Sequence, residues 1–362
     1  MQESVTGGPA PVRVRVSVVA TVRNEARSIA TLLDSLCRQT RAPDEVVIAD
    51  GGSTDGTLTI LRQYEGRLPL RVLSLHDANI SQGRNAAIAI ATGEIIACTD
   101  AGVRLEPGWL AELVAPIEAE EAEKAQLAQL RGHLDVPEFP WTFAPVQVVR
   151  GFFQADPHTV FEAALGATTL PDLEDIDPAH FLPSSRSVAF RKSAWEAAGR
   201  YPEWLDYCED LVFDLRLREV AGPEGWAFAP HAVAHFRPRP DLCAFFRQYY
   251  RYARGDGKAD LWRARHAVRY GTYLLALPAL LLLGARVSRL FHIVLGLAAF
   301  AYLRTPYRRL RPYLARYGPA DRLRAILWVP IIRLTGDVAK MIGYPVGVWW
   351  RLKKRAGRSW RD

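Results

Sequence analysis

The chain alternates short apolar runs with helical patterns from Val16 to about Ala119, and this alternation constrains the fold more than any other feature. The apolar runs are VSVVATV, DEVVIAD, LRVLSL and EIIACTD, and the helical patterns that follow them are RSIATLLDSLCRQ, DGTLTILRQYEG, ISQGRNAAIAIA and PGWLAELVAPIEA. Strands that are apolar throughout and joined by helices are typical of a parallel sheet buried on both faces. We therefore expect an α/β fold with a Rossmann-like, mostly parallel sheet and helices on both faces.

The next part of the chain continues with mixed elements. The charged, alanine-rich run from Glu118 to Leu130 predicts a solvated helix. After it, VQVVRGFFQ predicts a strand, HTVFEAALGA a helix, SVAFRKSAWEAAGR a strand followed by a helix, and EDLVFDLRLREVAG an amphipathic helix that ends at Gly222. We expect this region to complete the α/β domain.

The basic residues are unevenly distributed. The chain has 46 Lys and Arg against 39 Asp and Glu, a net charge of +7. Basic residues are concentrated in the last third, before an apolar stretch: Arg247, Arg251, Arg254, Lys258, Arg263, Arg265 and Arg269. Such a distribution suits nucleic acid or an anionic membrane, and the apolar segments between the basic blocks favour the membrane. We expect a membrane-surface partner and no nucleic acid.

The stretch from Gly271 to Leu303 is apolar apart from Arg286, Arg289 and His292. One crossing of a bilayer needs about 20 apolar residues. An arginine at mid-membrane would cost roughly 2.5 to 3.5 kcal/mol. A helical hairpin over about 271–303 that turns near Gly284 to Arg289 avoids this cost, and leaves both of its basic flanks on one side of the membrane.

A second apolar segment runs from Leu323 to Trp350 and is interrupted by Arg333, Asp337 and Lys340. Their spacing of four and three residues places them on one face of a helix. This pattern predicts a helix over about 323–350 that lies in the membrane interface. The alternative is a soluble helix packed on the α/β domain.

Polar residues follow three of the predicted strands at the point where each ends. The first strand leads into Thr21, Arg23, Asn24 and Glu25, the second ends at Asp50 before Gly51-Gly52-Ser53-Thr54-Asp55-Gly56, and the fourth ends at Asp100. Ligands of open parallel sheets bind at the carboxyl ends of the strands. Glu25 and Asp55 have another explanation, since an acid at the start of a helix is favourable. Three acids at neighbouring strand ends favour a nucleotide site.

These segments resemble a known family. VSVVATVRNEA, VVIADGGSTDGT and QGRNAAIAIATGEIIACTDAG are similar, in order and spacing, to the donor-site motifs of family 2 glycosyltransferases with the GT-A fold. The resemblance extends over roughly residues 14 to 260. It implies an inverting enzyme that transfers a sugar from a nucleotide diphosphate donor, with UDP the commoner nucleotide and GDP the alternative.

The resemblance assigns a donor-binding role to a set of residues. Asp50 would accept a hydrogen bond from the base, Arg84 would face the donor, and Asp100 would help to hold a divalent metal, Mg²⁺ or Mn²⁺. The full predicted donor site comprises Thr21, Arg23, Asn24, Glu25, Asp50, Gly52, Ser53, Arg84 and Asp100.

One position departs from the family pattern. The family usually has a second acid two residues after the first, but this chain has Gly102 there. The remaining metal ligands would then be the diphosphate, water and His235, which lies where many such enzymes contribute a late histidine. Structural packing is an equal explanation for a single histidine.

The predicted catalytic base lies farther along the chain. Glu209 and Asp210 resemble the Glu-Asp pair from which the family draws this base, and we assign the role to Asp210. Inverting transfer needs one carboxylate to take the proton of the acceptor hydroxyl. The alternative is that both acids only stabilise the start of a helix.

The segment RQYYRYARGDGKA contains a variant of the Gln-x-x-Arg-Trp element of membrane-linked family members. Gln248, Arg251 and Tyr252 correspond to it, with Tyr in place of Trp. We expect Arg251 and Arg254 to hold the departing diphosphate, because guanidinium groups bind phosphate oxygens well. A basic helix bound to lipid headgroups is the competing interpretation.

Together these features predict a domain order and a function. We expect a flexible tail over 1–12, a nucleotide-sugar-binding half over 13–118, an acceptor and catalytic half over 119–265, and membrane-associated helices with a basic tail over 266–362. The first eleven residues lack the apolar core of a secretory signal, so the catalytic domain is expected in the cytoplasm, attached to the inner or plasma membrane.

The predicted acceptor is a hydroxyl of a membrane lipid or a lipid-linked molecule, in the synthesis of a glycan or glycolipid. Two other functions are weighed against this one. Gly102 suggests a catalytically silent member that binds nucleotide or lipid as an assembly factor. A nucleotidyltransferase also uses an α/β sheet, but it usually needs a Gly-rich loop after the first strand, where this chain has TVRNEA.

Overall fold

The computed structural model describes residues 12–134, 145–355 and 359–361. Residues 1–11 of the predicted tail lie outside the described residues. The chain divides into two compact units. The first unit comprises Met1–Phe153, Asp177–Glu203 and Phe213–His235, and the second comprises Gln154–Ile176, Trp204–Val212 and Phe236–Asp362. Each unit is described by itself.

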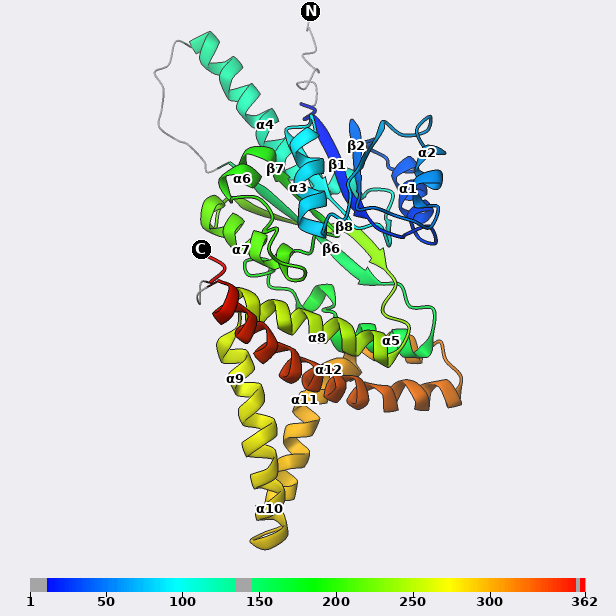
Figure 1. Cartoon of the computed structure of the whole chain (residues 1–362). Helices are drawn as coiled ribbons and strands as arrows, with labels where there is room; N and C mark the ends of the chain where they lie inside the picture. The colour runs from blue at the N-terminus through cyan, green and yellow to red at the C-terminus, as the bar shows by residue number, and fades with distance from the viewer. Residues whose placement is uncertain (1–11, 135–144, 356–358, 362) are drawn as a thin grey trace, which may run out of the picture. The chain divides into compact units, whose positions relative to one another are not determined.

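Within the described residues, one sheet of eight strands forms, in the order β3-β2-β1-β4-β7-β6-β8-β5. The strands are β1 (Val16–Val22), β2 (Glu45–Asp50), β3 (Leu70–Ser74), β4 (Ile95–Cys98), β5 (Val103–Leu105), β6 (Val148–Ala155), β7 (Val188–Arg191) and β8 (Trp226–Phe236) (Figure 1). The α/β fold expected from the alternating pattern is confirmed.

The sheet is mixed, with a parallel half built from the alternating region. β1 pairs in parallel with β2 and β4, and β2 pairs in parallel with β3. β7 is antiparallel to both β4 and β6. The sequence did not predict this reversal, because a short buried run looks the same in either strand direction.

Helices cover both faces of the sheet in the first unit. They are α1 (Ile29–Cys37), α2 (Thr57–Arg62), α3 (Ile80–Ile90), α4 (Trp109–Leu134), α6 (Lys192–Ala197) and α7 (Glu209–Ala221), of which the first turn of α7 belongs to the second unit. From β1 the chain moves outward along the sheet to β2 and then to β3. It then passes through α3 and crosses back to β4, on the other side of β1. Right-handed crossovers therefore place α3 on the face opposite α1 and α2.

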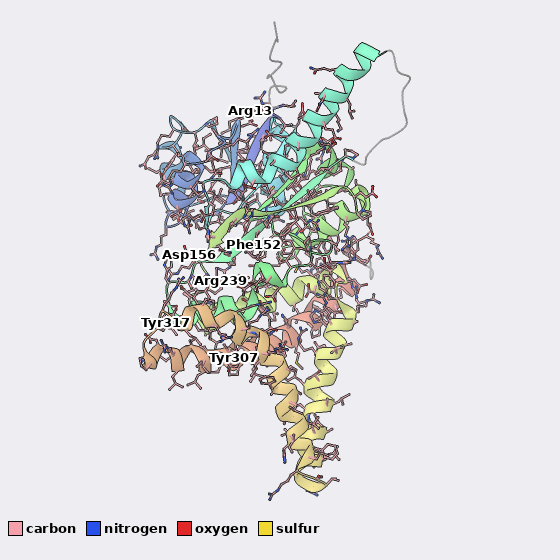
Figure 2. All side chains as sticks on the ribbon, turned by 180° about the vertical axis from the view of Figure 1, so that it is seen from behind. Arg13, Phe152, Asp156, Arg239, Tyr307 and Tyr317 are labelled. Atoms are coloured by element: carbon pink, nitrogen blue, oxygen red, sulfur yellow. The ribbon has the colours of Figure 1, made fainter. Side chains whose placement is uncertain are left out.

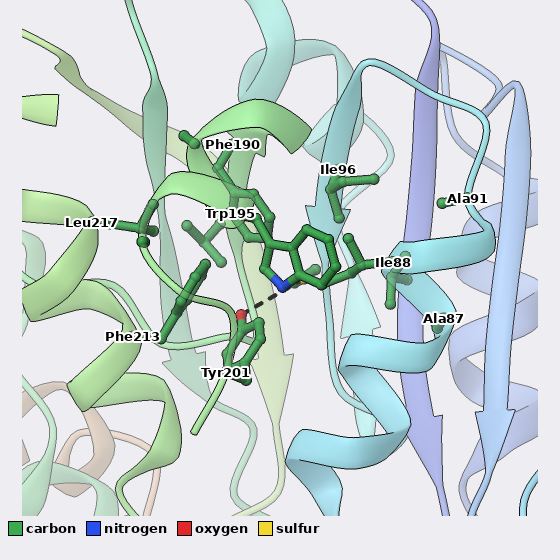
Figure 3. Packing of buried hydrophobic residues seen from close by; sticks show 14 of the residues in the cluster. Ala87, Ile88, Ala91, Ile96, Phe190, Trp195, Tyr201, Phe213 and Leu217 are labelled. Atoms are coloured by element: carbon green, nitrogen blue, oxygen red, sulfur yellow. Dashed lines mark hydrogen bonds between the residues drawn. The ribbon is translucent and has the colours of Figure 1, made fainter. Parts of the chain in front are cut away.

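The α3 face holds an aromatic core. Trp195 and Tyr201 lie at its centre, with Ile88 on one side and Phe213 and Leu217 on the other (Figure 3). On α1 the residues Ile29, Leu32, Leu33 and Leu36 are buried, as are Trp109, Leu113 and Ile117 of α4. Because β1, β2 and β4 are almost fully buried, the strand ends are held on a rigid support.

The second unit is helical. Its elements are α5 (Val160–Thr169), the short 3₁₀ helix η1 (Leu173–Asp175), α8 (Leu242–Ala259), α9 (Arg263–Gly271), the π-helical turn η2 (Thr272–Ala276), α10 (Leu277–Arg286), α11 (Leu290–Leu314) and α12 (Pro319–Lys354). Phe161 and Leu165 of α5, Phe245 of α8 and Val329 and Ile332 of α12 contribute to its core.

Helices α8 and α12 pack with their backbones in close approach. An added Cβ at Gly257 would meet the backbone of Tyr344, and one at Gly347 would meet the carbonyl of Arg254. Gly343 is closed in by Tyr250 in the same way. These glycines, rather than a pattern of large apolar residues, allow α12 to lie along α8.

The hairpin and α12 expose apolar side chains. Helices α9, η2 and α10 follow one another without a break, and the chain turns at Val287–Arg289 into α11 (Figure 1). In the described part of the chain, 263–286 and 290–314 are long and apolar enough, by length and composition, to cross a bilayer. Side chains stand outward along this hairpin (Figure 2), among them exposed Leu281, Leu282, Leu290, Ile293, Leu297 and Phe300. On α12 an exposed stripe comprises Leu323, Leu327, Ile331, Leu334, Val338, Ile342, Val346 and Trp349.

Candidate active site

The loops that follow β1 and β2 are locked together. Asn24 adopts a left-handed backbone conformation with φ of 57°. Its N–H donates to Ser53 Oγ at 2.8 Å, and its Oδ1 accepts from the N–H of Thr54 at 2.8 Å. Predicted donor residues from two strand ends are therefore held at fixed positions next to each other.

Asp50 organises the turn after β2. Its side chain is 1% exposed, and its Oδ2 accepts from the N–H of Gly52 at 3.3 Å and of Ser53 at 3.1 Å. Gly52 has φ of 90°, a conformation that glycine adopts without strain. The buried carboxylate thus fixes the shape of the loop, and its predicted contact with a nucleotide base stays a prediction.

The polar residues after β1 have different surroundings. The N–H of Glu25 donates to Thr57 Oγ1 at 2.9 Å, and the Glu25 carboxylate accepts from the hydroxyl of Ser28. Arg23 pairs with Asp77 at 2.8 Å on the surface. Thr21 is half-buried in β1, and Gly83 of α3 packs against its methyl group. Glu25 precedes the N-cap residue Ser28 of α1, and this helix has no acid in its first turn, so these contacts do not support the helix-start explanation.

Two arginines converge on Asp100, just beyond β4. Arg84 of α3 is 2% exposed, and its Nη2 lies 2.7 Å from Asp100 Oδ1. Arg186 Nε lies 3.5 Å from Asp100 Oδ2. The guanidinium of Arg84 also lies over the Tyr201 ring, 5.3 Å from its centroid, and this cation–π contact helps to hold the guanidinium in place. The structure thus places a carboxylate and two cations together at a strand end.

This site does not form a metal centre from side chains alone. In residues 12–134, 145–355 and 359–361 there is no group of three or more His, Cys, Asp or Glu side chains that would hold a metal ion. Asp100 fits as a single oxygen ligand, so the remaining ligands would have to come from the donor and water. A Cβ at Gly102 would meet nothing within 4 Å, so space for the missing second acid exists.

His235, the other predicted metal ligand, has a partner of its own. Its Nε2 lies 2.6 Å from Glu106 Oε1, and its side chain is mostly buried on β8. A carboxylate accepts hydrogen bonds, so this ring nitrogen is engaged with Glu106 rather than open toward a metal. This contact matches the packing role that the sequence left open for this histidine.

The predicted base lies at the start of α7, in the part of the chain that belongs to the second unit. Cys208 precedes the helix with φ of 65°, and its thiol donates to the carbonyl of Tyr252 at 3.2 Å. Burial, together with the carboxylates of Asp256, Asp210 and Glu209, raises the pKa of the Cys208 thiol. A buried cysteine in a strained conformation therefore sets the direction in which Glu209 and Asp210 leave the turn.

The Gln-x-x-Arg-Tyr element on α8 packs on the segment before this turn. Gln248 Nε2 donates to Tyr252 OH at 2.7 Å, and Arg251 Nη1 donates to Tyr207 OH at 2.8 Å. Arg254 pairs with Asp206 at 3.0 Å. Arg251 and Arg254 thus support residues 206–208, and their predicted binding of diphosphate stays untested.

Several residues that contact the predicted site residues were not predicted from the sequence. Arg186, Tyr207 and Asp206 lie in loops with no periodicity, so no sequence pattern marks them. Glu106 follows the short strand β5, which was also not predicted. Only an observed contact identifies such residues.

Part of the chain is similar to a known protein family. Residues 17–193 match the family model described as Glycosyl transferase family 2. An uncharacterized glycosyltransferase of Nostoc sp. is 31% identical over 125 residues, covering 34% of this chain and 37% of that protein. The succinoglycan biosynthesis protein ExoA of Rhizobium meliloti is 29% identical over 252 residues, covering 67% of this chain and 68% of that protein.

A similarity to a solved structure extends over most of the chain. S. aureus TarS 1–349 has 18% sequence identity and a TM-score of 0.46, covering 95% of this chain and 92% of that chain. The family match coincides with the parallel strands, the locked loops and the Asp100 cluster described above. Residues 17–193, just under half of the chain, therefore match glycosyl transferase family 2 within the α/β domain, and the chain spans well under half the length of the first relatives it matches.

Proposed function

We propose that this chain is a glycosyltransferase that transfers a sugar, with inversion, from a UDP-sugar to a hydroxyl of a membrane-proximal, lipid-linked acceptor, with a GDP-sugar as the alternative donor. The observation that carries the proposal is the placement of Asp210. Asp210 is the second residue of α7 and follows the strained and buried Cys208 by two positions. A general base needs such a fixed position, because proton transfer requires close and constant geometry.

The donor is proposed to bind at the carboxyl ends of β1, β2 and β4. Asp50 and the locked Asn24–Ser53 contact give the loops a defined shape before any ligand arrives. Arg84 and Arg186 bring positive charge to the same edge of the sheet, where a diphosphate would need it. Thr21, Arg23 and Glu25 complete the proposed pocket.

A divalent metal, Mg²⁺ or Mn²⁺, is part of the proposal. Asp100 would be its protein ligand, with donor oxygens and water as the others. When bound, such an ion neutralises charge on a leaving diphosphate. The two guanidinium groups at Asp100 offer a second source of positive charge at the same place.

The proposed reaction needs one proton transfer by the protein. Asp210 takes the proton of the acceptor hydroxyl as the oxygen attacks the anomeric carbon from the face opposite the leaving nucleoside diphosphate. Glu209 is 7% exposed and lies beside it in the chain. We propose that Glu209 positions Asp210 rather than reaching the substrate.

We propose that the hairpin 263–314 and the exposed stripe of α12 attach the enzyme to the inner or plasma membrane, with the catalytic domain in the cytoplasm. The stripe repeats at intervals of three or four residues, which produces one apolar face. An amphipathic helix with this pattern lies in the membrane interface. The proposed domain order is the donor half, the acceptor half and then these helices.

The test measures nucleoside diphosphate release by the detergent-purified chain from UDP-, GDP- and dTDP-sugars, with membrane extract as acceptor and with or without Mn²⁺ or Mg²⁺. Asp210→Asn should reduce turnover by roughly 10²- to 10⁴-fold while donor binding persists. Glu219→Gln, an exposed carboxylate on the same helix, is the matched control and should leave turnover unchanged.

The outcomes separate the alternatives. Donor binding without turnover in the parent chain would support the silent assembly factor. Release of pyrophosphate from an NTP and a sugar phosphate would support a nucleotidyltransferase. Turnover that is equal in Asp210→Asn and the parent chain would show that Asp210 only begins a helix.

A further inference from the structure

The helices of the second unit line a partly open cavity, and none of the proposed donor or base residues belong to its lining. It has a volume of about 110 Å³ and is lined by Thr168, Thr169, Phe245, Tyr249, Tyr302, Ile332, Arg333, Gly336, Asp337 and Lys340. A water molecule needs about 10–15 Å³ of such space, so the cavity has room for a tetrahedral anion. Its walls come from α5, α8, α11 and α12.

Two cations in this cavity lack a carboxylate partner. Lys340 has no ion pair within the described residues, and its ammonium lies 4.8 Å from the centroid of the Tyr249 ring. Arg333 lies 4.8 Å from the centroid of the Tyr302 ring, and its buried Nε has no hydrogen-bond partner in the described part of the chain. Both side chains are half-buried, and cations partly withdrawn from water are normally paired, so the cavity offers two positive charges to an anion.

Asp337, the carboxylate in the wall, is already engaged. Its Oδ1 accepts from Arg269 Nε at 2.8 Å, and its Oδ2 accepts from Tyr273 OH at 2.8 Å and from Tyr302 OH. Arg269 therefore balances Asp337, and Arg333 and Lys340 leave an excess of two positive charges. Burial, and after it the nearby Arg269, lower the pKa of Lys340, while Asp337 and Asp256 oppose this shift.

The helices that line the cavity also carry exposed apolar residues. On α12, the exposed Leu334 and Val338 flank Arg333, Asp337 and Lys340 in the chain. On α11, the exposed Phe300 precedes Tyr302 by two residues. A ligand that joins an anionic group to a hydrocarbon chain would satisfy both features.

We propose that this cavity binds the phosphate group of an amphipathic acceptor, with Arg333 and Lys340 as the phosphate ligands. The proposal rests on the proposed function, because it names the chemistry of the membrane-bound acceptor. Lys340 offers up to three donors and Arg333 a planar fork, both of which suit phosphate oxygens. The hydrocarbon chain would lie along the exposed residues of α11 and α12.

The test is a binding titration of the full chain in an uncharged detergent with dodecyl phosphate, dodecanol and inorganic phosphate. Arg333→Gln/Lys340→Gln removes the two cavity cations. Arg324→Gln/Lys354→Gln is the matched control, because it makes the same charge change at exposed positions of the same helix. The cavity variant should bind dodecyl phosphate at least about tenfold more weakly than the parent chain and the control.

Two further comparisons test whether the bound phosphate belongs to an amphipathic molecule and whether the cavity variant is still folded. Dodecanol should bind weakly to all variants, and inorganic phosphate should bind more weakly than dodecyl phosphate; equal affinity for inorganic phosphate would overturn an amphipathic ligand. Arg333→Lys/Lys340→Arg keeps both charges and should retain binding, which separates lost recognition from lost folding. Equal binding by the cavity variant and the control would overturn the site.

Donor turnover, measured as above, separates this inference from the proposed function. If the parent chain binds dodecyl phosphate through the cavity but no donor turns over, the proposed function fails and the phosphate site stands. If a donor turns over and the cavity variant binds dodecyl phosphate as the parent does, the phosphate site fails and the proposed function stands.

Discussion

Gly255 of α8 lies directly against Cys208, which stands two residues before the predicted base Asp210. A Cβ added at Gly255 would lie 2.9 Å from Cys208 Sγ and 2.6 Å from the carbonyl oxygen of Tyr207. Such distances are too short for carbon, so no larger residue fits without a shift of the segment. The position of Glu209 and Asp210 therefore depends on the absence of a side chain on a different helix.

Gly255→Ala should displace the turn before α7 and reduce kcat by about tenfold to a hundredfold. Overpacking of this kind also costs typically about 1–3 kcal/mol of stability. The measurement is kcat together with thermal unfolding. Gly271→Ala is the control, because a Cβ there meets nothing within 4 Å and alanine favours a helix. Unchanged kcat in Gly255→Ala would contradict the dependence of Asp210 on this contact.

Asp100→Asn should destabilise the protein even without a donor. The substitution leaves the buried guanidinium of Arg84 without its charged acceptor, and Asp100 is 28% exposed. We expect a loss of about 1–3 kcal/mol in the free energy of unfolding, measured by denaturant titration. Asp77→Asn breaks the exposed pair with Arg23 and should cost less than about 1 kcal/mol. Equal losses in the two variants would refute a structural role of Asp100.

Gly102→Asp should be tolerated and should increase the affinity for Mn²⁺ in the presence of UDP. The position is exposed and open, so the new carboxylate has room, and it adds an oxygen ligand two residues from Asp100. Calorimetric titration of Mn²⁺ measures the change. Gly66→Asp, at another exposed and open glycine, should have no effect. If both variants bind Mn²⁺ like the parent chain, the metal does not bind beside Asp100.

Glu45 should make the free energy of unfolding depend on pH in the acidic range. Burial alone would raise the pKa of Glu45, but hydrogen bonds from Ser17, Thr92 and Arg71 outweigh it and lower the pKa to about 2. The stabilisation is therefore complete above the ordinary pKa of 4.5 and is lost as the pH falls from there toward 2.

Glu45→Gln should flatten this dependence by at most about 1.4 kcal/mol per pH unit between about pH 4.5 and 3. Denaturant unfolding at a series of pH values measures the slope. Glu65→Gln, at an exposed carboxylate, should leave the slope as it is in the parent chain. A slope that is identical in Glu45→Gln and the parent chain would disprove the assignment.

The sequence predicted the elements whose pattern is local. The runs that became β1, β2 and β4 are mostly apolar because both faces of these strands are covered, and their consecutive residues show this burial. The turn after Asp50 was also readable, because Gly52 has a backbone conformation that glycine favours. These features need no knowledge of distant residues.

The sequence alone therefore determined the α/β alternation, the family motifs and the shared helix face of Arg333, Asp337 and Lys340. Tertiary structure alone decided that β7 runs antiparallel to β4, that Arg186 joins Asp100, and that Arg333 and Lys340 line a cavity with Tyr249 and Tyr302. The physical reason is that spacing fixes which residues share a face of one helix or strand, whereas ion pairs and cavities depend on which distant segments pack together.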